Sequence, residues 1–231
     1  MNENKIKSSG GVDRSHGFSF VQRLTFSFGH LQVVFMAAFV LFVSGLPVPD
    51  QSRGVVLLAC AVLYWLRHSV TLFYLLQRRV DWGEVIGLLI FIALFELGFV
   101  TLGAGFWRDK AIPFGLLDYV GIVLVLVGSF LNTGSEVQRK WWKQNRSSKG
   151  HCYTGGMFAW SMHINYFGDV VLFTGWALLT SSFWTLILPI FMLFSFMFVH
   201  IPPLDEYLRQ RYGKEFEDYA ATTSKLIPGV Y

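Results

Sequence analysis

The chain contains 231 residues, of which 53% are hydrophobic and 15% charged, and its net charge is +4. Soluble domains carry about 25% charged residues, so this composition excludes an ordinary soluble domain and indicates an integral membrane protein. The modest net charge gives no indication of nucleic-acid binding. The two cysteines, Cys60 and Cys152, lack the spacing of zinc ligands, and we expect no metal site.

The chain contains six hydrophobic runs that approach or reach the length needed to cross a bilayer, about 20 residues. We therefore predict an all-α fold, a polytopic membrane helix bundle with about six transmembrane helices. The runs cover about Phe28 to Leu46, Val55 to Leu76, Val85 to Gly105, Leu116 to Leu131, Phe167 to Thr180 and Phe183 to Val199.

Polar segments flank this hydrophobic region. Residues 1–25 lack the apolar core and cleavage site of a secretory signal, and we expect them to form a polar cytoplasmic tail before a single membrane domain, 26–231. Near the other end, the segment 204–219 places its apolar and aromatic residues on one helical face. This pattern predicts a cytoplasmic C-terminal amphipathic helix.

The distribution of basic residues predicts the topology, because cytoplasmic loops carry an excess of Lys and Arg. With a cytoplasmic N-terminus, 15 of the 19 Lys and Arg residues fall in inside segments and 3 in outside loops. We therefore expect both termini in the cytoplasm. A bacterial inner membrane and an endoplasmic reticulum membrane both fit.

Ionisable residues within the hydrophobic runs are candidates for function, because each costs about 2.5–3.5 kcal/mol to insert into a membrane. Glu96 lies near the middle of the third run. One interpretation is a structural pair between Glu96 and Arg67 or His68. The other is a catalytic acid that binds a substrate carbonyl, with Tyr64 or Tyr74 as the partner donor.

A second candidate region is rich in polar residues at the membrane surface. The stretch 153–169 is apolar overall, yet it also carries the polar side chains expected of a ligand site. Upstream, the segment 132–143 follows the fourth run as a loop or as an amphipathic interfacial helix. The candidate ligand-binding residues are Asn132, Glu136, Lys143, Tyr153, His163, Asn165, Tyr166 and Asp169. Arg78, which ends the second run, is either a topology anchor or a phosphate contact.

Three motifs in this region resemble a known superfamily. Gly155-Gly156-Met-Phe, followed by Asn165-Tyr-Phe-Gly-Asp169, resembles the C-terminal pattern of the steroid 5α-reductases. Asn132-x-x-Ser-Glu136 and the ending that starts at Tyr207 resemble further motifs of that family. The DUF1295 proteins and the isoprenylcysteine carboxyl methyltransferases share this layout, and the resemblance covers about residues 120–231.

The resemblance implies a membrane enzyme whose cofactor-binding half, 116–231, faces the cytoplasm. The reductases use NADPH, and position by position the cofactor would lie against Asn132, Glu136, Lys143, Tyr153, Asn165, Asp169 and Tyr207, with Arg78 nearby. The methyltransferases show R-H-P-N-Y, of which His163, Asn165 and Tyr166 are present here. They also carry a Glu before a Leu, a position that resembles Glu206.

These observations leave three hypotheses for the function. The first is an NADPH-dependent reductase of a C=C bond in a steroid-like, sterol-like or isoprenoid lipid enone, with Glu96 as the acid. The alternative is an S-adenosylmethionine-dependent methyltransferase of a lipid or prenyl-cysteine carboxylate, with Glu206 and the segment 163–166 at the cofactor. The third is a non-catalytic relative. In each enzyme hypothesis the partner is a lipid-like small molecule in the membrane.

Overall fold

The computed structural model describes residues 17, 19–108 and 110–231, and within these ranges it is helical and contains no strand. Five helical segments are long and apolar enough to cross a membrane, and a sixth, α6, is apolar but shorter. The predicted all-α membrane bundle is therefore confirmed, with five full-length spans and one short apolar helix. The spans are α2 (Phe20–Phe42), α3 (Gln51–Val70) with a π-helical turn (Thr71–Leu75), α4 (Trp82–Ala104), α5 (Leu116–Lys143) and the composite segment Phe183–Tyr212; α6 is Ile164–Leu179.

The composite segment joins two α-helices, a 3-10 turn and a π-helical turn without a break. A 3-10 turn (Phe183–Leu186) leads into α7 (Ile187–Ser195), a π-helical turn (Phe196–His200) follows, and α8 (Ile201–Tyr212) continues the path. Gly213, with φ of 55°, ends α8, and α9 (Lys214–Thr222) then turns back. The predicted amphipathic helix at 204–219 is therefore two helices that meet at a glycine.

Two boundaries differ from the sequence prediction. Helix α2 begins at Phe20, within the segment expected to be a polar tail. Its first turn is anchored because Arg23 donates hydrogen bonds to the carbonyl oxygens of Leu72 and Arg78, both at 2.8 Å. Helix α5 continues through Lys143, so of the two interpretations of the segment 132–143 the helix is confirmed and the loop was wrong. The remainder of the predicted tail, residues 1–16 and 18, lies outside the described residues.

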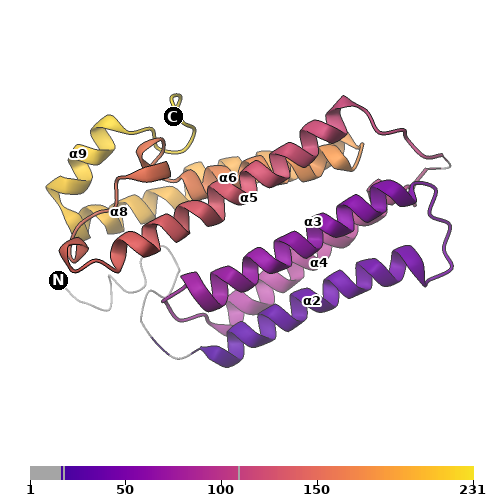
Figure 1. Ribbon diagram of the computed structural model, residues 1–231, viewed down its shortest axis with the longest axis horizontal. Helices are drawn as coiled ribbons and strands as arrows, with labels where there is room; N and C mark the ends of the chain where they lie inside the picture. Colours follow the sequence, from indigo (N-terminus) through magenta and orange to yellow (C-terminus); the bar gives the residue numbers. More distant parts are fainter. Residues whose placement is uncertain (1–16, 18, 109) are drawn as a thin grey trace.

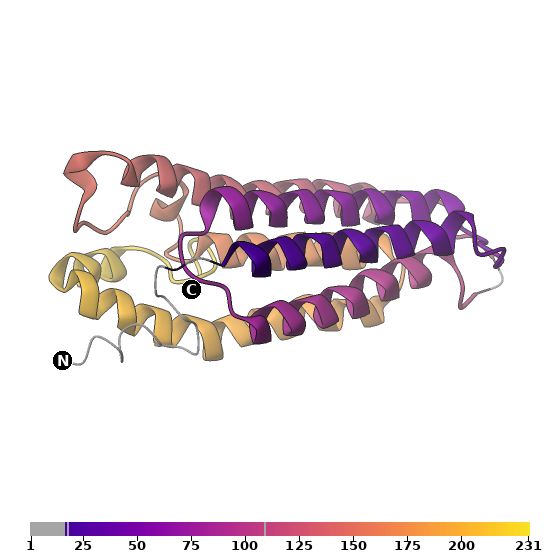
Figure 2. The same cartoon turned by 90° about the horizontal axis from the view of Figure 1, so that it is seen from below.

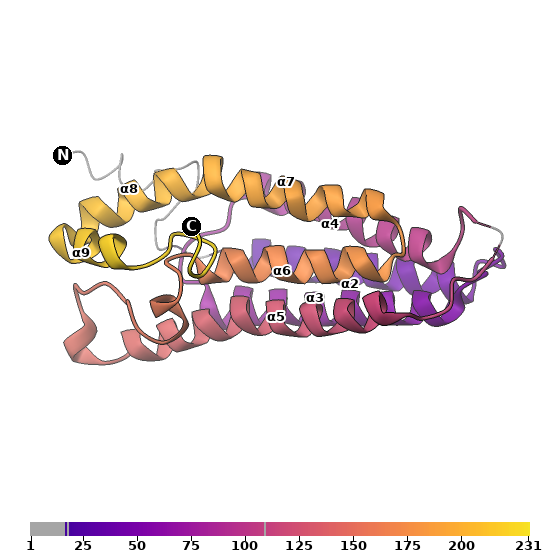
Figure 3. The ribbon, with the colours of Figure 1, turned by 90° about the horizontal axis from the view of Figure 1, so that it is seen from above.

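The helices form two groups that lie side by side (Figure 1). Helices α2, α3 and α4 form one group, and α5 and α6 form the other, with α7 and α8 running along it (Figures 1 and 3). Helices α5 and α8 extend beyond α2–α4 at one end, where α9 and the chain's C-terminus also lie (Figure 2). We call this end the C-terminal end and the opposite end the far end.

Helices α5 and α6 pack with their backbones in direct contact. A Cβ atom added to Gly128 would lie 2.3 Å from the amide nitrogen of Leu172, and one added to Gly168 would lie 2.5 Å from the amide nitrogen of Asn132. Small residues permit such close approach between membrane helices. Since these glycines leave no space to slide, they fix the register between Asn132 on α5 and Asn165 on α6.

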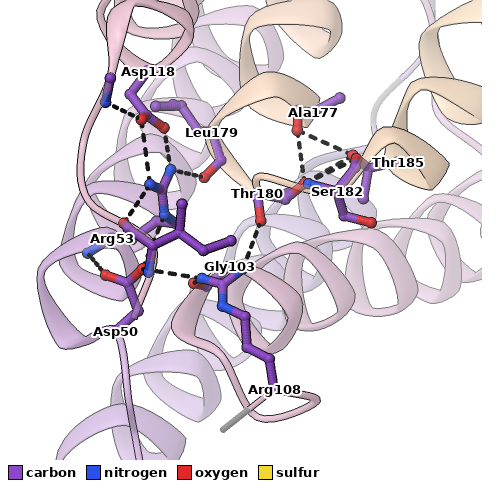
Figure 4. A network of polar contacts seen from close by, with 12 residues as sticks. Asp50, Arg53, Gly103, Arg108, Asp118, Ala177, Leu179, Thr180, Ser182 and Thr185 are labelled. Atoms are coloured by element: carbon purple, nitrogen blue, oxygen red, sulfur yellow. Dashed lines mark hydrogen bonds and ion pairs between the residues drawn. The ribbon is translucent and has the colours of Figure 1, made fainter. Parts of the chain in front are cut away.

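Helix α3 ties the two groups together through two arginines. Arg53 and Arg67 lie about four helical turns apart and therefore on one face of α3. At the far end, the buried Arg53 forms ion pairs with Asp50 and Asp118 and donates to the carbonyl oxygen of Leu179 at 3.0 Å (Figure 4). Nearer the C-terminal end, Arg67 donates to Thr133 and Asp169, both at 3.1 Å. The two arginines thus bind α3 to α5 and α6 at two positions along the bundle.

Candidate functional site

A cavity of about 80 Å³ lies at the C-terminal end, where α5, α6, α8 and α9 meet. Helix α5 brings two cations to it, the segment before α6 brings aromatic and polar side chains, and α8 and α9 cover it. Its lining residues are Arg139, Lys143, Cys152, Tyr153, Phe158, Met162, His163, Asn165, Leu204, Leu208, Tyr212 and Tyr219.

The α5 side of the cavity is a hydrogen-bonded cluster. The side-chain amide of Asn165 donates to Glu136 at 3.1 Å, and Glu136 also forms an ion pair with Arg139. Asn132 donates to the backbone carbonyl oxygen of Asn165 at 3.0 Å. The tight α5–α6 packing therefore places an amide, a carboxylate and a guanidinium together at one wall.

The α8 side is organised by a buried histidine–aspartate pair. The Nε2 atom of His163 lies 2.7 Å from Oδ1 of Asp205, and both residues are buried. The His163 ring stacks on Tyr166, with centroids 5.7 Å apart, and Tyr166 stacks on Phe196 at 4.6 Å. Lys225 lies 3.7 Å from the other oxygen of Asp205. This pair connects the segment 163–166 with α8, the two regions that the methyltransferase hypothesis assigned to one site.

The C-terminal residues hold the segment before α6 in place. The amides of Met162 and His163 donate to the carbonyl oxygens of Ser224 and Lys225, at 2.8 and 3.1 Å. Tyr219 donates its hydroxyl to the carbonyl oxygen of Phe158, and burial raises the pKa of this phenol. The cavity wall therefore depends on the last residues of the chain.

Two lining residues have distinct chemical states. Lys143 makes no hydrogen bond or ion pair with any described residue, although its side chain lines the cavity. Burial, followed by the nearby carboxylate of Glu215, raises the pKa of the Cys152 thiol to about 11. The site thus offers a lysine that no hydrogen bond or ion pair from the described part of the chain holds, and a thiol that stays protonated at neutral pH.

Below the cavity lies the Arg67–Asp169 pair. Asp169 is one helical turn further along α6 than Asn165, or about 6 Å. Its carboxylate accepts from Arg67 at 3.1 Å, and Arg67 also donates to Thr133 on α5. This pair therefore joins α3, α5 and α6 one helical turn beyond the cavity-lining Asn165.

Glu96 has a partner that the sequence prediction did not name. It contacts His30 of α2, with Oε1 and Nε2 2.8 Å apart, rather than Arg67 or His68. His30 in turn contacts His68, with their Nδ1 atoms 3.1 Å apart. His30 lies within the first predicted run, but it is 66 positions from Glu96 and no local pattern relates the two residues.

The predicted tyrosine partners of Glu96 lie in two different places. The Tyr64 ring is buried and packs edge-on against the rings of His30 and His68. Tyr74 is exposed near the C-terminal end, where it contacts Lys140 and accepts a hydrogen bond from Trp141 at 3.1 Å. The structure therefore brings Tyr64 to the Glu96 cluster and keeps Tyr74 apart from it.

The predicted cofactor residues divide into three sets. Four of them line the cavity: Lys143, Tyr153, His163 and Asn165. Four others contact that wall or lie one turn away: Asn132, Glu136, Tyr166 and Asp169. Three lie elsewhere. Arg78 forms a bidentate pair with Glu84, Tyr207 contacts Arg211, and Glu206 contacts Arg209 and Gln210 on the exposed side of α8.

Sequence reasoning missed several lining residues. Arg139, Tyr212 and Tyr219 line the cavity but were not among the candidate residues. Asp205 was also missed, because the resemblance pointed to its neighbour Glu206. Adjacent residues on a helix point in different directions, so only one of Asp205 and Glu206 can face inward. The packing of α8 shows which one does, and the sequence alone does not.

A larger cavity of about 370 Å³ lies at the far end, between the start of α5, the end of α6 and the turn before α7. Its walls include Leu116, Leu178 and Phe183, and its carboxylate, Asp118, is held by Arg53 and by the amide of Gly115 at 2.8 Å. Because the Asp118 carboxylate is already held by these two groups, we regard the cavity at the C-terminal end as the better candidate for a reaction. Among the described residues there is no cluster of His, Cys, Asp and Glu that could hold a metal ion.

Comparison with known proteins identifies the family. The family model described as "Protein of unknown function (DUF1295)" matches residues 90–223, which include most of the candidate site. The chain belongs to this family. The resemblance to DUF1295 proteins that the motifs indicated is thereby confirmed.

A curated relative carries the name of an enzyme. The "Probable O-methyltransferase ustE" of Ustilaginoidea virens is 30% identical to this chain over 108 residues, which cover 46% of this chain and 38% of the relative. The matched region thus spans well under half of the relative's length. The match favours a methyltransferase over the reductase that the sequence analysis placed first.

Proposed function

We propose that this DUF1295 protein is a membrane-embedded methyltransferase that uses S-adenosylmethionine to methylate an oxygen of an apolar substrate. The proposal rests on the O-methyltransferase name of the relative and on the charge balance of the C-terminal cavity. Because most of the basic residues face the C-terminal end, the proposal also places this end in the cytoplasm.

The charge balance is the observation that carries this proposal. Arg139 is paired with Glu136, Arg67 with Asp169 and Arg78 with Glu84, so that Lys143 is the lining cation that forms no ion pair with a described residue. NADPH carries several phosphate charges, which call for cations that are free to bind them. S-adenosylmethionine carries one carboxylate and two cationic groups, so a site with one unpaired lysine beside the carboxylates of Glu136 and Asp205 suits it better.

The residues at the cavity fit the parts of this cofactor. Lys143 would bind the carboxylate of the methionine part, and Glu136 and Asn165 would hold its ammonium group or the ribose hydroxyls. Pockets that enclose a drug-sized ligand measure about 300–1,000 Å³, whereas this cavity measures about 80 Å³. Full binding therefore requires α8 and α9, which cover the cavity, to move outward.

His163 is the residue placed to accept the substrate's proton. Asp205 accepts a hydrogen bond from Nε2 of His163, which leaves Nδ1 as the basic nitrogen of the neutral ring. When bound, S-adenosylmethionine supplies a methyl group activated by the sulfonium, so that an O–CH₃ bond forms as the S–CH₃ bond breaks. The proton released by the substrate hydroxyl would pass to His163.

The direct test is cofactor binding to the purified full-length protein. S-adenosylmethionine at about 100 times its dissociation constant should stabilise the fold by about 2.7 kcal/mol, which a thermal-shift assay detects. Lys143→Met should reduce this stabilisation, and Lys149→Met, which changes an exposed lysine outside the lining residues, is the matched control. Stabilisation by NADPH alone would overturn the proposal and restore the reductase hypothesis.

Methyl transfer gives a second readout. Incubation with S-adenosylmethionine labelled in its methyl group, followed by extraction of the membrane lipids, should yield a labelled apolar product. His163→Gln should reduce the yield about 100-fold, a typical contribution of a general base. His151→Gln replaces a mostly exposed histidine and should leave the yield unchanged. Binding of S-adenosylmethionine without any labelled product would argue for a non-catalytic relative.

A further inference from the structure

The larger cavity, about 370 Å³ at the far end, has room for a ligand of its own, and we call it the far-end cavity. Pockets that enclose drug-sized ligands measure about 300–1,000 Å³, so its volume falls at the lower end of that range. Most of the side chains that line it are apolar, among them Leu116 and Leu117 of α5, Leu178 of α6 and Phe183 in the turn that follows. The far-end cavity is therefore suited to a ligand with an apolar part.

The walls of this cavity include apolar side chains on the outer surface of the bundle. Leu116 and Phe183 are 77% and 79% exposed, although both line the cavity. Two tryptophans are also exposed at the same end, Trp184 beside Phe183 and Trp107 after the end of α4. Exposed tryptophans favour the boundary between lipid headgroups and hydrocarbon. These features place the far-end cavity at the lipid boundary of the leaflet opposite to the C-terminal end.

The charge at the cavity determines what kind of headgroup it can hold. The lining acid, Asp118, is 4% exposed, and its Oδ2 atom accepts hydrogen bonds from Arg53 at 3.3 Å and from the amide of Gly115 at 2.8 Å. The described residues that line the cavity include no lysine, arginine or histidine. A charged headgroup would lose its hydration there without gaining a partner of opposite charge, which is costly. The cavity therefore favours a neutral ligand.

The turn between α6 and α7 supplies the polar groups of the cavity. Thr180 and Thr185 are buried, and their hydroxyls donate to the carbonyl oxygen of Ala177 at 2.7 and 3.0 Å (Figure 4). Ser181 and Ser182 line the cavity instead, and neither hydroxyl forms a hydrogen bond with a described residue. The two threonines thus hold the turn in place, and the two serines are available to a ligand.

The backbone of Ser181 supports a role for its side chain. Its φ of 54° lies in the left-handed region. Ser181 follows Thr180, the C-cap of α6, at a position where helices commonly have glycine, because glycine adopts this conformation without steric cost. The serine therefore keeps a strain that glycine would remove. Strained backbone of this kind occurs preferentially at functional sites.

We propose that the far-end cavity binds a neutral lipid with one apolar chain and a hydroxyl-bearing headgroup, of the monoacylglycerol class. The headgroup hydroxyls form hydrogen bonds with Ser181 and Ser182, and the chain lies against Leu116, Leu178 and Phe183. A volume near the lower limit for ligand pockets suits one chain better than two. The site lies at the opposite end of the bundle from the C-terminal cavity, so it is separate from the proposed methyl transfer.

The test uses a monoacylglycerol with a photoreactive diazirine in its chain, added to the full-length protein in phosphatidylcholine nanodiscs without cofactor. After illumination, mass spectrometry of the digested protein locates the adducts. They should concentrate in the segments 112–118 and 177–186, which contain the lining residues, and excess unlabelled monoolein should suppress them. Lysophosphatidylglycerol, which has one chain and an anionic headgroup, should require a concentration at least about tenfold higher for the same suppression, because the cavity offers its charge no partner.

Two variants test the contacts with the headgroup. Ser181→Gly removes one hydroxyl and should raise the monoolein concentration needed for suppression about fivefold, the typical effect of one neutral hydrogen bond. It should not lower the melting temperature, because glycine tolerates a φ of 54°, and this separates a binding role from a structural one. Ser182→Ala should weaken suppression to a similar extent. Ser52→Ala is the matched control, because Ser52 is exposed at the start of α3, at the same end but outside the lining residues.

The outcomes decide between a specific site and general contact with lipid. Adducts spread evenly over the lipid-exposed surfaces of α2 and α4 as well would overturn the site. Equal suppression by lysophosphatidylglycerol, or unchanged suppression by monoolein in both serine variants, would also overturn it. Adducts confined to the two cavity segments, with weaker suppression in Ser181→Gly and Ser182→Ala but not in Ser52→Ala, support it. Because no cofactor is added, a failure of the methyl-transfer proposal would leave this result unaffected.

Discussion

The packing of α5 against α6 makes a quantitative prediction for Gly128→Ala. A Cβ atom at this position would meet three backbone atoms: Leu172 N at 2.3 Å, Gly168 O at 2.5 Å and Leu172 Cα at 2.7 Å. Backbone atoms cannot rotate away as the end of a side chain can, so the two helices must separate. Overpacking of a well-packed core costs about 1–3 kcal/mol, and we expect a loss of stability in this range.

For a chain of this size, 1 kcal/mol corresponds to about 2–4 °C in melting temperature, so Gly128→Ala should lower it by about 2–12 °C. Gly98→Ala in α4 is the matched control, because no atom lies within 4 Å of its added Cβ and alanine favours a helix more than glycine does. Thermal unfolding in detergent, followed by circular dichroism, measures both variants. A Gly128→Ala protein as stable as Gly98→Ala would refute the backbone-to-backbone packing.

Three further predictions concern single side chains. In a Cys60→Ala background, maleimide should label Cys152 about 100-fold more slowly at pH 8 than an ordinary thiol, because the pKa of the Cys152 thiol is raised from 9.0 to about 11. The labelling rate should rise as the pH approaches 11. A rate that has already reached its plateau at pH 8 would contradict this prediction. Arg53→Met should lower the unfolding free energy by about 3–5 kcal/mol, because it leaves the buried carboxylate of Asp118 without a cation, whereas Asp50 keeps Arg108. Asp118→Asn in the same chain should recover part of the loss measured in denaturant unfolding. Glu96→Gln should leave methyl transfer unchanged, whereas a large loss of turnover would favour the reductase hypothesis, in which Glu96 is the acid.

The membrane helices were largely predictable, because their signal is local. Apolar runs of membrane-spanning length gave each span, and Gly105 and Gly213 mark the ends of α4 and α8. The ends that extend beyond the membrane were not predictable in this way. Helix α5 contains polar residues after Leu131, and it stays helical because some of them contact other parts of the C-terminal end: Arg139 lies over the ring of Phe158, and Trp141 donates to the hydroxyl of Tyr74.

The partners of the buried charges were not predictable, because they depend on contacts between helices far apart in sequence. Arg53 appeared to be a residue of an outside loop, yet it pairs with Asp118, 65 positions later. Glu96 pairs with His30, 66 positions earlier. A sequence shows that a charge within a span needs a partner, but several candidates satisfy that need equally well. Only the arrangement of α2, α3 and α5 decides among them.

The adjacent acids Asp205 and Glu206 allow the structure-based assignment to be tested against the motif-based one. Asp205 is buried and 2.7 Å from His163, whereas Glu206 is exposed and bonded to Arg209 and Gln210. Asp205→Asn keeps the volume of the side chain but removes the charge that stabilises a protonated His163. We therefore expect methyl transfer to fall about 100-fold, with little change in the thermal shift produced by S-adenosylmethionine.

Glu206→Gln, the matched variant, should leave both measurements unchanged if the packing of α8 assigns the roles correctly. The opposite result, with activity lost in Glu206→Gln and kept in Asp205→Asn, would mean that α8 rotates by about 100° when the cofactor binds. In that case the motif would describe the active conformation better than this structure does. The proposed binding of S-adenosylmethionine requires α8 to move, because the cavity of about 80 Å³ is too small to enclose this cofactor, and this pair of variants shows whether that movement is a displacement or a rotation.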